Sequence, residues 1–192
     1  MTEEHASPAT ILVEEGFAEW RGGGLTEASA RFTAALEREP SNALAWSGLG
    51  FVKWSEGEFA EALKMFMAAA RSDASTASVW SNIGVCLRAL KAYDRAANAF
   101  AVALFIDPSY APALNEWGNT LQDQGLSAEA VPYYLRALAF DPSRAVVHHN
   151  LGVAYTRLGE TMLAVHSFTA ALDRDAAYAH SLGKLGSSSR NS

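Results

Sequence analysis

The sequence predicts an all-α solenoid of stacked helical hairpins, and three observations lead to that prediction. The chain repeats itself every 34 residues without insertion or deletion, and the copies begin at Ala9, Ala43, Ala77, Ala111 and Ala145. Within each copy, apolar residues follow the spacing of two successive helices. Small and aromatic residues recur at fixed steps of the copies, namely Gly16, Gly50, Gly84, Gly118 and Gly152, then Ala28, Ala62, Ala96, Ala130 and Ala164, then Phe32, Phe66, Phe100, Tyr134 and Phe168. Units this short cannot bury an apolar face alone, so each is expected to pack against its neighbours.

The third copy, residues 77–110, shows how each hairpin is expected to form. From Trp80 to Leu87, apolar or small residues fall at i, i+3, i+4 and i+7, which is one face of a helix. The same spacing resumes at Tyr93 on a second helix. Asp107 precedes a proline, and this position is pushed out of helical geometry, so the second helix should end there.

The recurring glycine and the recurring ring are interpreted as packing residues. A glycine inside a helix costs about 1 kcal/mol relative to alanine, so Gly84 is expected only where close contact requires it. We expect Gly84 to let the two helical backbones approach closely. Phe100 is expected to fill a wider gap between units. These residues would stabilise the solenoid, and no binding role is assigned to them.

The copies also predict the domain organisation. We expect an N-terminal tail and cap at residues 1–8, repeats over 9–178, and an incomplete capping helix with a flexible serine-rich tail at 179–192. Ser7 and Pro8 suit the cap and first position of a helix. The five repeats would occupy residues 9–42, 43–76, 77–110, 111–144 and 145–178. Because solenoids normally close with a polar capping helix, the short last segment favours end-to-end self-association or a place within a longer repeat protein.

Composition narrows the classes of function. The formal net charge of −6 argues against a nucleic-acid partner, which normally needs a basic stripe. Cys86 is the single cysteine, so neither an internal disulfide nor a thiolate zinc site is expected. No apolar run approaches the ~20 residues that span a bilayer, so no membrane insertion is expected. The acidic start lacks a signal-peptide core, and we therefore expect a cytoplasmic protein.

No group of residues suggests catalysis, a cofactor or a bound metal. His148 and His149 are adjacent, so on a helix they would point about 100° apart and could not easily share one ion. Gly22, Gly23 and Gly24 lack the preceding strand and the following Lys-Ser/Thr of a phosphate loop. Cys86 is interpreted as a small buried hydrophobe. We expect a protein that is not an enzyme and carries no cofactor.

The repeated unit resembles the tetratricopeptide repeat, and the resemblance covers roughly residues 9–178. In the third copy it is carried by Trp80, Ile83-Gly84, Leu87, Ala96, Phe100 and Pro108. In the fifth copy it is carried by Leu151-Gly152, Tyr155, Gly159, Ala164, Phe168 and Ala171. The resemblance implies a right-handed superhelix in which the first helices line a concave groove. Five in-phase copies make it specific.

The resemblance also implies which residues line the groove, namely those of the first helices that face away from the second helices. They are aromatic in the first two copies and mostly polar in the last three. The candidates are Phe17, Trp20, Phe51, Trp54, Asn82, Arg88, Asn115, Asn119, Gln122, Asp123, His149, Asn150 and Arg157. A peptide with an apolar anchor at one end would suit such a groove. Amides offer both donors and acceptors to a peptide backbone.

Packing inside the protein is the alternative for the aromatic candidates. The first two copies lack the family's tyrosine and carry Glu19 and Lys53 at that step. Trp20 and Trp54 could therefore turn inward and fill the gap. The amides could likewise belong to a solvated helix face.

Two known groove types match only in part. The carboxylate clamp of related repeats needs lysine, asparagine, asparagine, lysine and arginine across three copies. Asn119 and Asn150 occupy its asparagine steps. The cationic steps are held by Asn115, His180 and Lys184, of which only Lys184 could stand in for the arginine. The asparagine ladder of O-linked sugar transferases is matched at Asn82 and Asn150 and not in the other copies.

The leading interpretation is an adaptor or scaffold that binds a peptide or helix of another protein. Three alternatives remain open, one of which is a secretion or cargo chaperone, although the short chaperones of that kind carry fewer repeats. The chain could be a self-assembling scaffold, joined as a homo-oligomer through its poorly capped C-terminal end. It could also be the targeting segment of a larger enzyme such as a glycosyltransferase.

Overall fold

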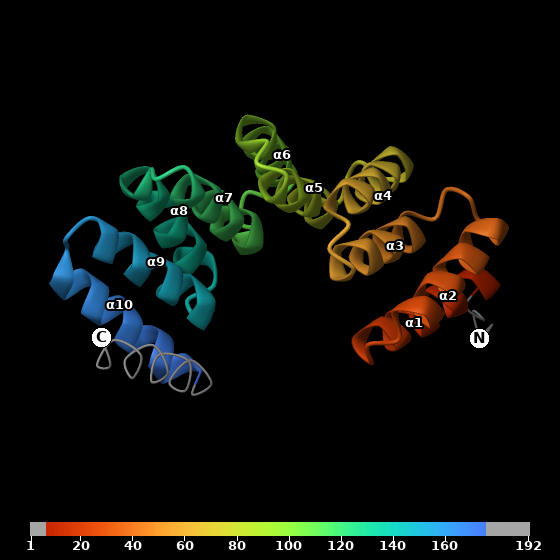
Figure 1. Cartoon of the computed structure of the whole chain (residues 1–192), viewed down its shortest axis with the longest axis horizontal. Helices are drawn as coiled ribbons and strands as arrows, with labels where there is room; N and C mark the ends of the chain where they lie inside the picture. Colours follow the sequence, from red (N-terminus) through yellow and green to blue (C-terminus); the bar gives the residue numbers. More distant parts are fainter. Residues whose placement is uncertain (1–6, 176–192) are drawn as a thin grey trace, which may run out of the picture. The chain divides into compact units, whose positions relative to one another are not determined.

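Ten α-helices form the part of the chain that the structure, a computed structural model, describes, which is residues 7–175 (Figure 1). No strand occurs between residues 7 and 175, so the predicted all-α fold is confirmed. None of these ten helices is long and apolar enough to cross a bilayer. Most of the predicted N-terminal tail and the whole of the predicted capping segment at 179–192 lie outside the described residues.

The N-terminal unit of the chain ends at Asp107 and contains three helical hairpins. Its helices are α1 (Pro8–Arg21), α2 (Leu25–Arg38), α3 (Ala43–Ser55), α4 (Phe59–Ser72), α5 (Ala77–Ala89) and α6 (Tyr93–Ile106). Consecutive helices pack against each other, and α1 also contacts α3 (Figure 1). The core of this unit lies between the helices of each hairpin and between neighbouring hairpins.

The C-terminal unit begins at Pro108 and contains two helical hairpins within the described residues. Its helices are α7 (Ala111–Asp123), α8 (Ser127–Phe140), α9 (Ala145–Arg157) and α10 (Thr161–Arg174). They pack in chain order, and α7 also contacts α9. The contact between the first helices of neighbouring hairpins therefore occurs in both units.

The first helix is capped as predicted. The Ser7 hydroxyl oxygen accepts a hydrogen bond from the Thr10 backbone N–H at 3.1 Å, and Pro8 is the first helical residue. A cap of this kind stabilises a helix by about 0.5–2 kcal/mol. The same hydroxyl donates to the Glu39 carboxylate at 3.0 Å, which ties the start of α1 to the end of α2.

An aromatic ring of the second helix lies over the glycine of the first helix in all five copies. A Cβ atom added to Gly16 would lie 2.7 Å from the Phe32 ring, and one added to Gly118 would lie 2.6 Å from the Tyr134 ring. Real Cβ atoms do not approach other atoms so closely. The glycine is therefore needed to admit a ring, and the prediction that it simply brings two backbones together is corrected. The five pairs are Gly16 with Phe32, Gly50 with Phe66, Gly84 with Phe100, Gly118 with Tyr134 and Gly152 with Phe168.

The turn inside each hairpin takes a left-handed backbone conformation at the same step of every copy. Four copies have glycine there, with φ between 78° and 87°. The third copy has Lys91, with φ of 59°. A residue with a Cβ atom is disfavoured in this conformation by about 1–2 kcal/mol. The five residues are Gly23, Gly57, Lys91, Gly125 and Gly159.

Replacing Lys91 with glycine is expected to raise the free energy of unfolding by about 0.5–1 kcal/mol. Relief of the left-handed strain should exceed the extra conformational freedom that glycine adds to the unfolded chain. Urea unfolding of the variant and the wild type would measure the difference. The reverse change at the same step, Gly57→Lys, serves as the matched control and should destabilise by a similar amount. A loss of stability in Lys91→Gly would contradict the strain that the φ angle indicates.

A ring N–H of the first helix closes the preceding loop in several copies. Trp46 and Trp80 donate their indole N–H to the backbone carbonyl six residues earlier, at 2.9 and 3.0 Å. His148 occupies the same step, and its Nε2 lies 3.1 Å from the carbonyl oxygen of Pro142. Burial lowers the pKa of His148 below its ordinary value, and the hydrogen bond to Pro142 only partly offsets this effect. A structural role in the loop explains this histidine without a metal.

Candidate protein-binding surfaces

Half-buried aromatic side chains of α1 and α3 form a continuous surface in the N-terminal unit. The centre of the Phe51 ring lies 6.3 Å from that of Phe17 and 5.3 Å from that of Trp20. Separations of roughly 4.5–7 Å are favourable for aromatic pairs. We call these three side chains the aromatic row.

Buried rings of the second helices hold the aromatic row in place. Phe17 packs edge-on against Phe32 at 5.0 Å, and Phe51 packs edge-on against Phe66 at 5.2 Å. Phe32 and Phe66 are 0% and 2% exposed, whereas the residues of the row keep part of their surface exposed. The row is therefore an apolar surface fixed from behind by the core.

Trp20 and Trp54 occupy the same step of successive copies but make different contacts. The Trp20 indole N–H donates to the Ser55 hydroxyl at 3.1 Å, which links α1 to α3. The Trp54 ring instead lies 4.7 Å from Phe59, the first residue of α4. Trp20 thus belongs to the aromatic row, whereas Trp54 packs toward the second helix of its own hairpin.

Lys53, which stands at the family's tyrosine step, does not fill the core. Its ammonium group lies 2.8 Å from the Glu56 carboxylate and 2.9 Å from that of Glu58. Hydrogen bonds to Glu56 and then Glu58 raise the pKa of Lys53 above its ordinary value. The lysine therefore stays charged at the surface, at the C-terminal end of α3.

α5 carries the remaining candidates of this unit, Asn82 and Arg88, together with the single cysteine. Both candidates are partly exposed. They are six residues apart and so point about 120° apart around the helix. Cys86 is 0% exposed, and burial raises the pKa of its thiol to about 12. The prediction that Cys86 is a small buried residue is confirmed.

Side-chain amides of α7 and α9 come together in the C-terminal unit. The Asn150 amide nitrogen donates to the side-chain oxygens of Asn115 and Asn119, at 3.0 Å in each case. The Gln122 amide nitrogen donates to the Asn150 backbone carbonyl at 3.0 Å. Arg157 donates to the Gln122 backbone carbonyl, also at 3.0 Å. We call Asn115, Asn119, Gln122 and Asn150 the amide network.

Tyr134 of α8 also belongs to this network, whereas its step in the repeat predicted only a packing role. Its buried hydroxyl donates to the Asn119 side-chain oxygen at 2.8 Å and accepts from the Gln122 amide at 2.9 Å. The other four copies have phenylalanine at this step. A hydroxyl at a core step needs a partner when it is buried, so the tyrosine was a usable signal for nearby amides.

The amide network leaves two side-chain oxygens open within the described part of the chain, because its other amide groups are bonded within the protein. Glu116 accepts hydrogen bonds from Asn115 at 2.9 Å and from Asn119 at 3.3 Å. Within residues 7–175, no hydrogen bond reaches the side-chain oxygens of Gln122 or Asn150. These two oxygens can accept backbone N–H groups of a peptide.

Replacing Tyr134 with phenylalanine is expected to lower the free energy of unfolding by about 1 kcal/mol. The ring is kept, but Asn119 and Gln122 each lose one buried hydrogen-bond partner. Urea unfolding would measure the change. Tyr133→Phe on the same helix is the matched control and should be nearly neutral. Equal effects of the two variants would show that the Tyr134 hydroxyl contributes nothing.

The remaining polar candidates, His149 and Asp123, show no metal-binding arrangement. The His149 ring packs against Phe168 at 5.5 Å, and burial lowers its pKa below the ordinary value. Asp123 is exposed at the end of α7. Among the residues that the structure describes, no three histidine, cysteine, aspartate or glutamate side chains gather where an ion could bind. His180, named in the comparison with the carboxylate clamp, lies outside these residues.

Comparison with known proteins identifies the repeat. Sequence models of the tetratricopeptide repeat match residues 13–51, 52–111, 111–144 and 133–166. These ranges include most of the chain. The search among curated protein sequences found no match.

Solved structures show the same solenoid fold. PilF of Pseudomonas aeruginosa matches with a TM-score of 0.80 and 21% identity, over 87% of this chain and 76% of that chain. MamA of Desulfovibrio magneticus RS-1 matches with 0.72 and 17%, over 90% and 97%. YrrB, described as a TPR protein with an unusual peptide-binding site, matches with 0.63 and 24%, over 95% of each chain. At these identities the similarity establishes the fold.

Proposed function

Because this chain belongs to the tetratricopeptide repeat family, whose members are protein-interaction modules, we propose that it is an adaptor that binds a peptide or short helix of another protein. The aromatic row takes an apolar side chain of the partner. In the amide network, where Asn115 is only 4% exposed, the side-chain oxygens of Gln122 and Asn150 accept N–H groups of a partner backbone. The adaptor catalyses no reaction and acts in the cytoplasm.

The observation that carries this proposal is the partial exposure of the aromatic row. Phe17, Trp20 and Phe51 are partly exposed, yet each contacts another ring at a fixed geometry. Aromatic side chains dominate the energy of many protein interfaces. Rings that are already ordered lose little conformational entropy on binding, which favours affinity.

The proposal is tested by selecting binders from a displayed library of random peptides and measuring their affinity. The variant Phe17→Ser/Phe51→Ser removes two rings of the row, and we expect it to lose most of the binding. Because these rings also touch the core, thermal melting must be measured on the same samples. Ser55→Glu is a second variant: it places a carboxylate, which can still accept the Trp20 N–H, on an exposed residue beside the row, and it should weaken binding far more than it lowers the melting temperature.

Phe105→Ser is the matched control for the loss of a phenylalanine. Phe105 is 88% exposed on α6, so its replacement should change neither binding nor melting. Selected peptides that bind all variants as tightly as the wild type would show that the aromatic row is not the binding site. Binding lost only in proportion to melting would assign the row to packing.

A further inference from the structure

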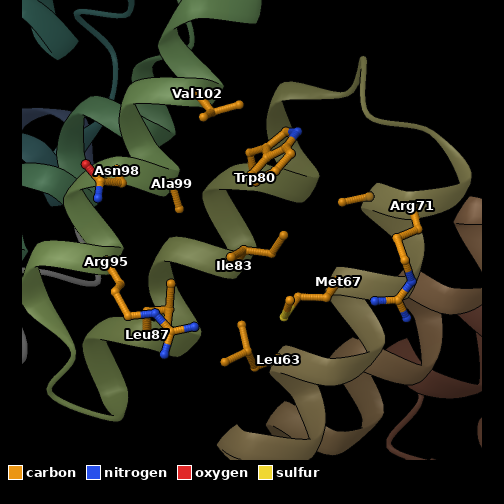
Figure 2. Close-up of a pocket in the computed structure, with 11 residues that line it drawn as sticks. Leu63, Met67, Arg71, Trp80, Ile83, Leu87, Arg95, Asn98, Ala99 and Val102 are labelled. Atoms are coloured by element: carbon orange, nitrogen blue, oxygen red, sulfur yellow. The ribbon is translucent and has the colours of Figure 1, made fainter.

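α4, α5 and α6 line an apolar pocket of about 500 Å³ that is open to the surface and shares no residue with the aromatic row (Figure 2). Leu63 and Met67 of α4 extend toward Ile83 of α5, and Trp80 closes one end. Pockets of roughly 300–1,000 Å³ are typical of binding sites. Met67 is 41% exposed, and methionine adapts its shape to different partners. We call this hollow the α4–α6 pocket.

Two arginines flank the α4–α6 pocket. Figure 2 shows Arg71 of α4 and Arg95 of α6 on opposite sides of the apolar residues. Both are exposed, and no acidic residue lines the pocket. Within residues 7–175, neither guanidinium group forms an ion pair or a hydrogen bond with the protein. By contrast, Lys64 on α4 is paired with Glu61 at 2.6 Å.

The positive charge at this pocket is not a property of the repeat framework. One copy earlier, the steps of Arg71 and Arg95 are occupied by Glu37 and Glu61. The sign of both charges is therefore reversed at the same two steps. The positions equivalent to Arg71 and Arg95 are Phe105 and Glu129 one copy later, and Ala139 and Leu163 two copies later. Neither of these pairs has two cations.

We propose that the α4–α6 pocket binds a short acidic segment of a partner protein. One or two apolar side chains of that segment enter between Met67 and Ile83. Carboxylates on either side of them pair with Arg71 and Arg95, which suit bidentate contacts with carboxylate. Unpaired cations at both rims of an otherwise apolar pocket favour an acidic occupant over a basic one. This site is separate from the aromatic row and does not depend on it.

The test uses two sets of fluorescein-labelled peptides that share a central apolar pair, one leucine and one phenylalanine. One set has glutamates at both ends of the apolar pair, and the other has lysines. We expect the wild type to bind the glutamate peptides at least about tenfold more tightly than the lysine peptides. This ratio corresponds to a difference of about 1.4 kcal/mol in binding free energy. Arg71→Glu/Arg95→Glu should reverse this preference. Arg38→Glu/Arg136→Glu changes the net charge equally at exposed residues outside the pocket and should preserve it.

The outcomes also separate this proposal from the aromatic row. Phe17→Ser/Phe51→Ser should leave binding of the glutamate peptides unchanged, because the two surfaces share no residue. Absence of binding by the glutamate set, or equal binding by wild type and Arg71→Glu/Arg95→Glu, would overturn the proposal. A concentration-dependent dimer that Arg71→Glu/Arg95→Glu abolishes would overturn it in favour of a second copy of this chain as the occupant.

Discussion

Truncation of Phe66 to alanine is expected to lower the free energy of unfolding by about 3–5 kcal/mol. Phe66 is 2% exposed, and its ring lies over Gly50 and packs against Phe51 at 5.2 Å. The change leaves a cavity between α3 and α4 and removes the support of one ring of the aromatic row. Because domains are stable by only about 5–15 kcal/mol, this single substitution would consume a large part of the total.

Urea unfolding followed by circular dichroism would measure the loss. Phe105→Ala deletes the same ring from a site that is 88% exposed, and its effect should stay within about 0.5 kcal/mol. If the two variants were equally stable, Phe66 would not be the core anchor that its burial indicates.

Replacement of Gly50 by alanine is expected to destabilise the protein by about 1–3 kcal/mol, because the added methyl group overpacks the hairpin. A Cβ atom at this position would lie 2.8 Å from the Phe66 ring. The expected loss runs against helix propensity, which on its own favours alanine over glycine by about 1 kcal/mol. The direction of the change therefore distinguishes packing from propensity.

The double variant Gly50→Ala/Phe66→Ala completes the test. Once the ring is absent, the alanine at position 50 should be neutral or should stabilise the helix by up to about 1 kcal/mol. Urea unfolding of the four proteins in this cycle would give the coupling energy. Simple additivity of the two single effects would mean that Gly50 and Phe66 do not act on each other.

The hairpins could be predicted from the sequence because each step of the repeat recurs with the same residue type. α3, α5, α7 and α9 begin at the first residues of the predicted copies, and the proline steps lie just beyond α2, α6 and α8. The contacts of each recurring residue were less predictable than the helices themselves. The period gives positions along a helix, and it does not say whether Gly84 faces a backbone or the Phe100 ring.

The binding candidates were harder to place, because equivalent steps have different neighbours. Trp20 donates to the Ser55 hydroxyl of the next hairpin. For Trp54, the equivalent residue of the next hairpin is Ala89, which has no side-chain acceptor. Trp54 packs on Phe59 instead. The amides were identified, whereas their mutual hydrogen bonds through Tyr134 depend on three-dimensional proximity that a linear pattern does not contain.

The shared left-handed turn lets the first helix of one copy be joined to the second helix of another. Gly23, Gly57, Lys91, Gly125 and Gly159 all have a positive φ, so the same kind of turn could connect helices that now belong to different hairpins. Duplication or excision of the 34 residues between two such turns would then leave the remaining turns intact. The length of such a protein can change in steps of one hairpin while each surface on the retained hairpins keeps its residues.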